Sequence, residues 1–254
     1  GKLELQNDLL WVDAGEVDIQ GTYVRNEWAF LYGVVQNGAL WGTISGVSKQ
    51  DMGVYVRVEN DYYWEENLAF FQDPDYLFNN LGIQGDVTLS VNLTVGANRN
   101  ICVEGMEGNW LTIDEDVTLT TGSHITVYEG YGLTNNGTIV LNSDYGNTLE
   151  IEGSMTNNGT VKNNRNSYIR VSAGGELTNN NRIVNNWDIY VQGSLVNYGN
   201  IDMMDTGNPD FYTLLQIESG GSAENYGDVD CYGAGTVNVL GRWDGKDPVY
   251  HSIP

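Results

Sequence analysis

The sequence predicts an all-β fold, a solenoid of stacked coils, on the evidence of two units that repeat along its second half. One unit reads Leu-Thr-Asn-Asn-Gly-Thr-Ile at residues 133–139 and returns four more times with variations. The other is an apolar–x–apolar run followed by a Gly turn. The first residues of its seven copies are Ile101, Ile125, Leu149, Ile169, Ile189, Leu215 and Val237. A period near 22 residues, with alternation at period two inside each copy, is typical of a solenoid built from strands.

The charge of the chain excludes two classes of partner. The sequence has 34 acidic and 11 basic residues, a formal net charge of −23. Such a charge repels nucleic acid and anionic membrane surfaces, so we expect neither as a partner. No run approaches 18 consecutive apolar residues, so we expect no membrane insertion. We expect a secreted chain from which a signal peptide has been removed.

Residues 1–62 do not follow the repeat. They contain short apolar runs separated by glycine, at residues 9–12, 29–32, 39–41 and 54–58. Alternation and enrichment in β-branched and aromatic residues predict strands there. We interpret this region as a small N-terminal β module; the alternative is that these runs are irregular early coils of the same solenoid.

Residues 63–84 are predicted to form a capping helix and an opening strand. Residues 65–71 combine helix formers with acidic residues in the first turn, and Pro74 ends the pattern. A solenoid exposes an apolar cross-section at each end and needs a cap. Phe70, Phe71 and Phe78 are expected to cover that end.

Residues 85–245 are predicted to form about seven coils, followed by a C-terminal tail at residues 246–254. Each coil should supply about three short strands whose apolar residues point inward and stack on their copies. One such inward column, aligned on Ile139, is predicted to contain Leu93, Val117, Ile139, Val161, Ile183, Ile201 and Val229.

A recurring asparagine marks a corner of the coil. It occurs at Asn135, Asn157, Asn179, Asn197 and Asn225. Stacked asparagines can form an amide ladder along the axis, and asparagine also stabilises turns. The glycines that follow at Gly137, Gly159, Gly199 and Gly227 are expected to meet a demand for positive φ. A structural role is therefore expected for this column.

The two cysteines, Cys102 and Cys231, are predicted to be free thiols. The alignment puts them six coils apart, or ~29 Å, which is far beyond the reach of a disulfide.

The capping helix, the opening strand and the Asn-Gly coils together resemble right-handed parallel β-helix domains of bacterial cell-surface proteins, including adhesin-like proteins of gut anaerobes. The resemblance covers roughly residues 65–245. It implies a right-handed parallel β-helix and an extracellular or cell-surface location. We expect an extracellular glycan or a host or cell-surface protein as partner.

The expected function is that of a non-enzymatic stalk or adhesin-like module, secreted or at the cell surface. An enzyme is the alternative function, because parallel β-helices also host polysaccharide lyases and glycoside hydrolases. A resemblance to the pectin-type hydrolases of this fold would require an adjacent Asp pair and a Gly-His-Gly motif. The sequence has no adjacent Asp pair, and neither His124 nor His251 is flanked by glycine. A lyase would use Arg or Lys as base; Arg170, one coil after Glu150, is better interpreted as half of a surface ion pair. We predict no catalytic residue.

Metal binding is expected to be limited to calcium. The acidic turn at Asp114 and Asp116 is a weak candidate, because hard oxygen ligands in turns can hold Ca²⁺. Asp228 and Asp230 are a similar pair. The two histidines lack companions at ligand spacing, so we expect no transition-metal site and no other cofactor.

A local group of aromatic residues is the main candidate binding site. Tyr168 and Arg170 lie on one coil, and Trp187 and Tyr190 lie on the next. Tyr190 is predicted to point outward directly over Arg170. Aromatic faces stack on sugar rings and Arg donates to hydroxyls, so these residues predict weak binding of neutral glycans. The alternative is that they only shield a turn.

Overall fold

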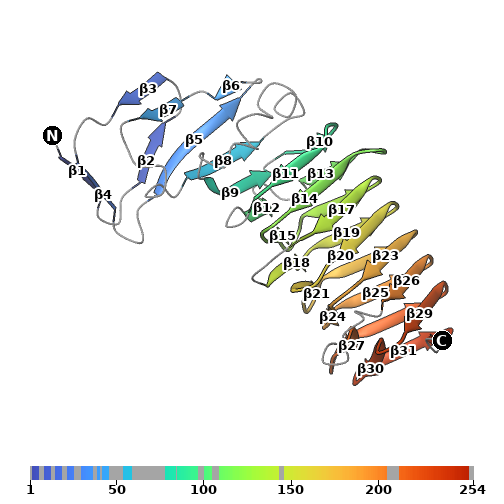
Figure 1. Cartoon of the computed structure of the whole chain (residues 1–254). Coiled ribbons are helices and arrows are strands. Elements are labelled where there is room, and N and C mark those ends of the chain that lie inside the picture. The colour runs from blue at the N-terminus through green and yellow to red at the C-terminus, as the bar shows by residue number, and fades with distance from the viewer. Residues whose placement is uncertain are drawn as a thin grey trace.

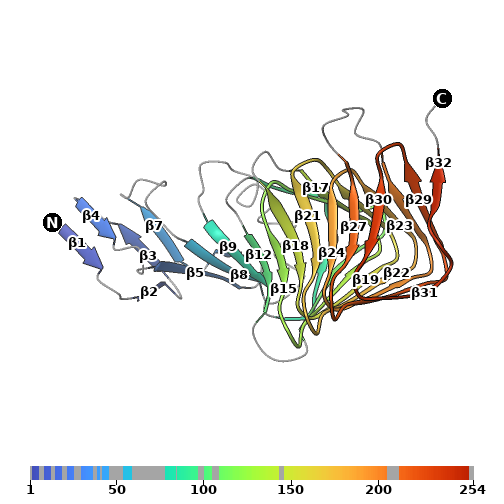
Figure 2. The same ribbon diagram turned by 90° about the horizontal axis from the view of Figure 1, so that it is seen from below.

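The computed structural model shows an all-β parallel solenoid of about seven coils (Figures 1 and 2). It describes side chains for residues 81–83, 85–96, 100–104, 109–142, 146, 148–204 and 212–251, and describes further N-terminal strands by their backbone. Each coil supplies one strand to each of three parallel sheets. The right-handed sense of the winding stays a prediction. The described residues include no helix that is both long and apolar enough to cross a membrane.

The coil region contributes to the three sheets in chain order. The first sheet contains β10 (Val87–Leu89), β13 (Trp110–Ile113), β16 (Gly132–Asn135), β19 (Ser154–Asn157), β22 (Glu176–Asn179), β25 (Ser194–Asn197), β28 (Ser222–Asn225) and β31 (Arg242–Gly245). The second contains β11 (Leu93–Val95), β14 (Thr118–Thr121), β17 (Thr138–Leu141), β20 (Thr160–Asn163), β23 (Arg182–Asn185), β26 (Asn200–Met203), β29 (Asp228–Tyr232) and β32 (Val249–His251). The third contains β9 (Phe78–Ile83), β12 (Asn100–Val103), β15 (Ile125–Val127), β18 (Asn147–Ile151), β21 (Ser167–Val171), β24 (Asp188–Val191), β27 (Leu214–Ile217) and β30 (Thr236–Val239).

The predicted register of the third sheet is confirmed. The seven apolar residues from Ile101 to Val237 pair in sequence order, each with its copy on the next coil. Their side chains point inward, and all but Val237, on the last coil, are buried. Like therefore stacks on like along the axis, which buries one continuous apolar core and pairs each inner strand on both edges.

One member of the predicted Ile139 column is wrong. Leu119, and not Val117, pairs with Ile139 and with Leu93. The corner between β13 and β14 holds four residues, 114–117, whereas the next coil turns with two, 136–137. The two extra residues shift the alignment by two positions. Because side chains alternate between inward and outward with period two, Val117 still matched the inward pattern in the sequence. Val117 lies in that corner and is still buried.

The asparagine column forms the predicted amide ladder. Each Nδ2 donates to Oδ1 of the next asparagine at 2.7 Å, from Asn135 through Asn157, Asn179 and Asn197 to Asn225. All five side chains are buried. Each of the five Nδ2 groups also donates to a backbone carbonyl, as Asn157 does to Arg182 O at 3.1 Å. Asn135 Oδ1, at the end of the ladder, is buried without a hydrogen-bond partner. The other amide oxygens of the ladder accept from a neighbouring coil, which makes the burial of these amides stable.

The predicted reason for the glycines after this column is wrong. None of Gly137, Gly159, Gly199 and Gly227 has a positive φ in the left-handed region. A Cβ on Gly159 would instead lie 2.0 Å from the carbonyl oxygen of Gly137, and one on Gly227 would lie 1.9 Å from that of Gly199. Glycine is required here because the backbone of the preceding coil approaches too closely for a side chain.

The N-terminal strands extend the third sheet. β2 (Leu9–Val12), β5 (Phe30–Gln36) and β8 (Val54–Val58) precede β9 in it, all parallel. β1 (Lys2–Leu5) pairs with β4 (Thr22–Arg25), β3 (Gly15–Asp18) with β7 (Gly42–Ser45), and β6 (Ala39–Leu40) with β5. The strands predicted from the four apolar runs are confirmed. The boundary of an N-terminal module at residue 62 stays a prediction.

The predicted capping helix is not found in the described residues. Its core, residues 65–71 with Phe70 and Phe71, lies outside them. Phe78, which was expected to continue the cap, instead begins strand β9, which pairs with β12. Alternation around Leu81 and Ile83, both fully buried, favours a strand over a helix at this position.

The last coil leaves part of the inner side exposed. β30, β31 and β32 end the three sheets. Val239 and Tyr250, which pair with buried residues of the preceding coil, are 42% and 61% exposed. Residues 249–251, predicted to belong to a C-terminal tail, therefore form a strand of the second sheet. Residues 252–254 lie outside the described residues.

Both cysteines are free, as predicted, and both are also buried. Burial raises the pKa of each thiol to about 11, and Tyr128 opposes this shift at Cys102 through a hydrogen bond. The thiols therefore stay protonated at pH 8 in the folded protein. We expect slow alkylation of the native chain by iodoacetamide at pH 8, and rapid modification of two thiols per chain after denaturation without reductant. Fewer than two thiols under denaturing conditions would contradict the structure.

Candidate functional site

The outer face of the third sheet carries the predicted aromatic group. Strand alternation turns Ile169 and Ile189 inward and leaves Tyr168, Arg170 and Tyr190 on the outer face. Arg170 pairs in register with Tyr190, as the alignment predicted. The regular repeat thus brings residues 20 positions apart in the sequence onto neighbouring strands.

Two tyrosines form the centre of this site. The rings of Tyr168 and Tyr190 are stacked, with centroids 6.2 Å apart and planes at 28°. The Tyr190 hydroxyl donates a hydrogen bond to Asp188 Oδ2 at 3.0 Å. This bond and the stacking fix the Tyr190 ring across two coils, so its position is set before any ligand arrives.

Partial burial raises the pKa values of both Asp188 and Tyr190. Burial raises the pKa of Asp188 above its usual range, although hydrogen bonds from Tyr190 and from the Leu214 backbone favour the carboxylate. Burial and the neighbouring Asp188 carboxylate raise the pKa of Tyr190 to about 12. The phenol therefore remains a hydrogen-bond donor throughout the physiological range of pH.

Trp187 takes part less directly than expected. Its side chain is partly buried and its indole nitrogen is shielded from solvent. Its backbone carbonyl accepts hydrogen bonds from Asn185 Nδ2 at 2.7 Å and from Leu214 N at 3.1 Å. Through these backbone bonds Trp187 also holds the corner that leads into β24.

The structure adds two residues that the sequence did not single out, Asp188 and Tyr212. Tyr212 is 60% exposed and lies close enough to Tyr190 to contribute to its raised pKa. The connection between β26 and β27 spans ten residues, whereas β23 and β24 are joined by only two. This insertion breaks the repeat, so the local sequence does not place Tyr212 near Tyr190.

The expected ion pair between Glu150 and Arg170 is not formed within the described residues. The two residues do pair in register, but Glu150 Oε1 accepts a hydrogen bond from Ser172 Oγ at 3.0 Å. Arg170 is exposed. Its guanidinium is therefore available to hydroxyl groups of a ligand that lies over Tyr190.

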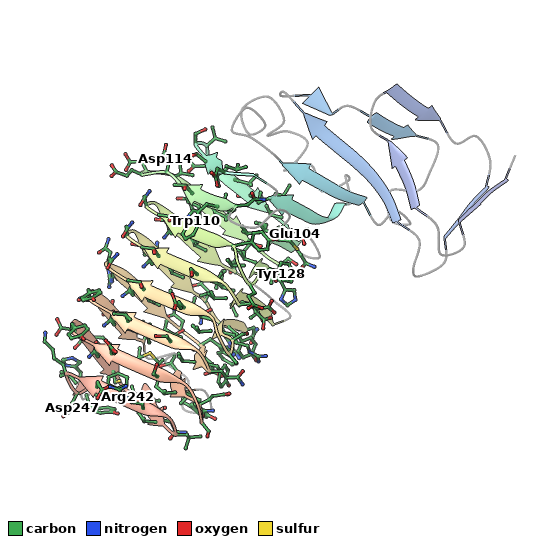
Figure 3. The ribbon with its side chains drawn as sticks, turned by 180° about the vertical axis from the view of Figure 1, so that it is seen from behind. Glu104, Trp110, Asp114, Tyr128, Arg242 and Asp247 are labelled. Atoms are coloured by element: carbon green, nitrogen blue, oxygen red, sulfur yellow. The ribbon has the colours of Figure 1, made fainter. Side chains whose placement is uncertain are left out.

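The arrangement of raised-pKa carboxyl groups on the third sheet does not favour glycosidase chemistry. Burial raises the pKa of Glu104 and of Asp188. Glu104 lies beside Tyr128 near the start of the coils (Figure 3), whereas Asp188 lies four coils further on. Four coil spacings are ~19 Å. Paired glycosidase carboxyls lie within ~10 Å of each other, so these two groups cannot act on one bond.

The charged residues on the outer face of the second sheet have a structural role rather than a role in binding a ligand. Asp202 and Asp230 pair in register on adjacent strands. Arg182 Nε lies 2.6 Å from Asp202 Oδ2, and His251 Nε2 lies 2.7 Å from Asp230 Oδ1. The His251 ring also stacks on Tyr232 at 4.8 Å. Both carboxylates therefore have partners within the protein. The contact between His251 and Asp230 joins the terminal strand β32 to β29.

The acidic turn proposed for calcium lies at an exposed corner. Asp114 and Asp116 are both exposed, and Asp116 has a positive φ of 62°. Among the described residues no group of three or more His, Cys, Asp or Glu side chains could hold a metal ion. A calcium ion at this turn would take its remaining ligands from carbonyl oxygens or water. Calcium binding here stays a prediction.

Comparison of the chain with protein-family models, with curated proteins and with solved structures finds no match.

Proposed function

We propose that this chain is a non-enzymatic module of the bacterial cell surface, or a secreted one, that binds neutral glycans weakly on the outer face of the third sheet. The observation that carries this proposal is the fixed Tyr168–Tyr190 pair. Arg170 supplies donors beside it, Trp187 and Tyr212 border it, and the resemblance to adhesin-like β-helices supports the location.

The chemistry of the site suits a sugar ring. Sugars present C–H groups on their faces and hydroxyls at their edges, and aromatic rings with nearby polar groups bind both. One stacked sugar contributes about 1–2 kcal/mol, so a single site should bind in the millimolar to high micromolar range. Useful adhesion would then require many copies on one surface.

The charge of the chain selects the class of glycan. A protein of net charge −23 repels sulfated and uronic polymers, so neutral glycans are favoured. Binding of a neutral ligand should change little with salt, because no ion pair is screened.

The test is a double substitution, Trp187→Ala with Tyr190→Ala. We expect this variant to lose binding to short neutral oligosaccharides in a glycan-array screen and in titration calorimetry, because it removes the aromatic surface. Gln216→Ala is the matched control, since Gln216 occupies the same outer position as Tyr190 on the next coil. Binding that survives the double substitution would refute this site. Thermal melting of all three proteins monitors folding.

A further inference from the structure

The outer face of the first sheet is almost free of charge. Between β13 and β28 it presents two columns of outward positions, set by the register of successive strands. One column contains Thr112, Thr134, Thr156, Thr178, Val196 and Glu224. The other contains Trp110, Gly132, Ser154, Glu176, Ser194 and Ser222. In a chain of net charge −23, only Glu176 and Glu224 of these twelve residues carry a charge.

An aromatic ring covers one end of this face. The six-membered ring of Trp110 occupies the space of a side chain at Gly132, since a Cβ there would lie 2.1 Å from its Cζ3 atom. The indole N–H donates to Thr134 Oγ1 at 2.6 Å. The ring therefore rests on the backbone of the next coil and is held in place, while the side chain stays partly exposed (Figure 3). Glycine at 132 makes this packing possible.

Two further aromatic rings border the other end. Tyr198 and Tyr226 follow the ladder asparagines of β25 and β28, at the corner next to this face. Their rings are stacked, with centroids 5.2 Å apart and planes at 12°, and they are 57% and 52% exposed. Tyr226 donates a hydrogen bond to Glu224 Oε2 at 3.0 Å, which turns its hydroxyl toward the first sheet.

A row of polar groups joins the two aromatic ends. At the same corner position on the preceding coils, Asn136, Asn158 and Asn180 form an exposed amide ladder with bonds of 2.9 and 2.8 Å. The threonine hydroxyls run parallel to this ladder at the ~4.8 Å spacing of the coils. We use the name axial strip for this surface. It consists of Trp110, the column of outward residues that begins with Thr112, the three exposed asparagines, Tyr198 and Tyr226.

We propose that the axial strip binds an extended neutral polysaccharide that lies along the solenoid axis. The coil spacing is close to the length of one pyranose unit in an extended chain, so successive sugars meet successive threonines and asparagines. Five coil steps, or ~24 Å, separate the strand of Trp110 from that of Tyr226. The aromatic rings contact sugar faces, and the hydroxyls and amides exchange hydrogen bonds with sugar hydroxyls. This inference takes its class of ligand from the proposed function, but uses different residues.

The experiment compares variants of the two faces. Thr156→Lys places a long charged side chain in the middle of the strip, and a second variant combines Tyr198→Ala with Tyr226→Ala. The control Thr160→Lys introduces the same side chain on the outer face of the second sheet in the same coil. Probes are soluble mixed-linkage β-glucan, galactomannan and their oligosaccharides of two to eight units, measured by affinity electrophoresis and calorimetry.

We expect both strip variants to bind the polymers at least about tenfold more weakly, and the control to match the wild type. Affinity should rise with chain length up to about six units, because six coils contribute. Unchanged polymer binding by the strip variants would overturn the inference. If Trp187→Ala with Tyr190→Ala then abolishes binding, the third-sheet site still stands. Loss confined to the strip variants would support the inference and refute that site. Wild-type protein that binds no probe would overturn both.

Discussion

Ile183→Asp is expected to lower the free energy of unfolding by more than ~3 kcal/mol. Ile183 is 1% exposed and lies in the middle of an inward column, paired with Val161 on one side and Ile201 on the other. An aspartate there would bury a carboxylate among apolar side chains with no partner. Urea denaturation followed by circular dichroism measures the loss.

Thr160→Asp is the matched control for this substitution. Thr160 lies one position before the inward Val161 and faces outward, partly exposed. Surface substitutions of this kind change stability by less than ~0.5 kcal/mol. Equal losses in the two variants would show that the assignment of inward and outward residues is wrong.

Gly159→Ala is expected to destabilise the protein by about 2–3 kcal/mol, because the new methyl group would press on the Gly137 carbonyl at 2.0 Å. The coil with Asn181 at the equivalent position shows how a Cβ is accommodated. Gly159 N donates to Asn135 O at 2.9 Å, but Asn181 N forms no equivalent backbone bond in the described residues. Its side chain donates instead to Asn158 O. In this coil a side-chain hydrogen bond replaces the backbone bond.

Gly174→Ala separates this steric cause from backbone strain. Gly174 has φ of 88°, and a Cβ added to it would have no atom within 4 Å. Alanine there meets only the cost of a left-handed conformation, ~1 kcal/mol. If chemical denaturation shows a smaller loss for Gly159→Ala than for Gly174→Ala, close approach of the coils is not the reason for the glycine.

Much of the fold could be predicted because the sequence contains two independent signals of it. A period near 22 residues indicates the coils, and alternation within each copy indicates the strands. The pairing of Ile125 with Ile101 and Leu149 follows from that pattern alone. Val117 was misplaced because an insertion of two residues preserves alternation. The role of Gly159 was missed because a contact between coils leaves no mark in the local sequence.

The candidate site could be predicted only where the repeat is regular. The register of Arg170 and Tyr190 followed from two coils of equal length. Tyr212 was missed because it follows a long insertion. Trp110 was missed because its packing depends on Gly132, one coil later, which lacks a side chain. The sequence contains this pair, but only the aligned register shows that the two residues meet.

Affinity electrophoresis of the wild-type chain tests the central claim most directly. The chain is run in native gels that contain mixed-linkage β-glucan, galactomannan or polygalacturonate, at low and at high salt, and the polymers are then assayed for new reducing ends. We predict retardation by a neutral polymer that is insensitive to salt, no retardation by polygalacturonate, and no new reducing ends. Retardation by polygalacturonate alone, or the release of reducing ends from any polymer, would contradict a non-enzymatic module that binds neutral glycans.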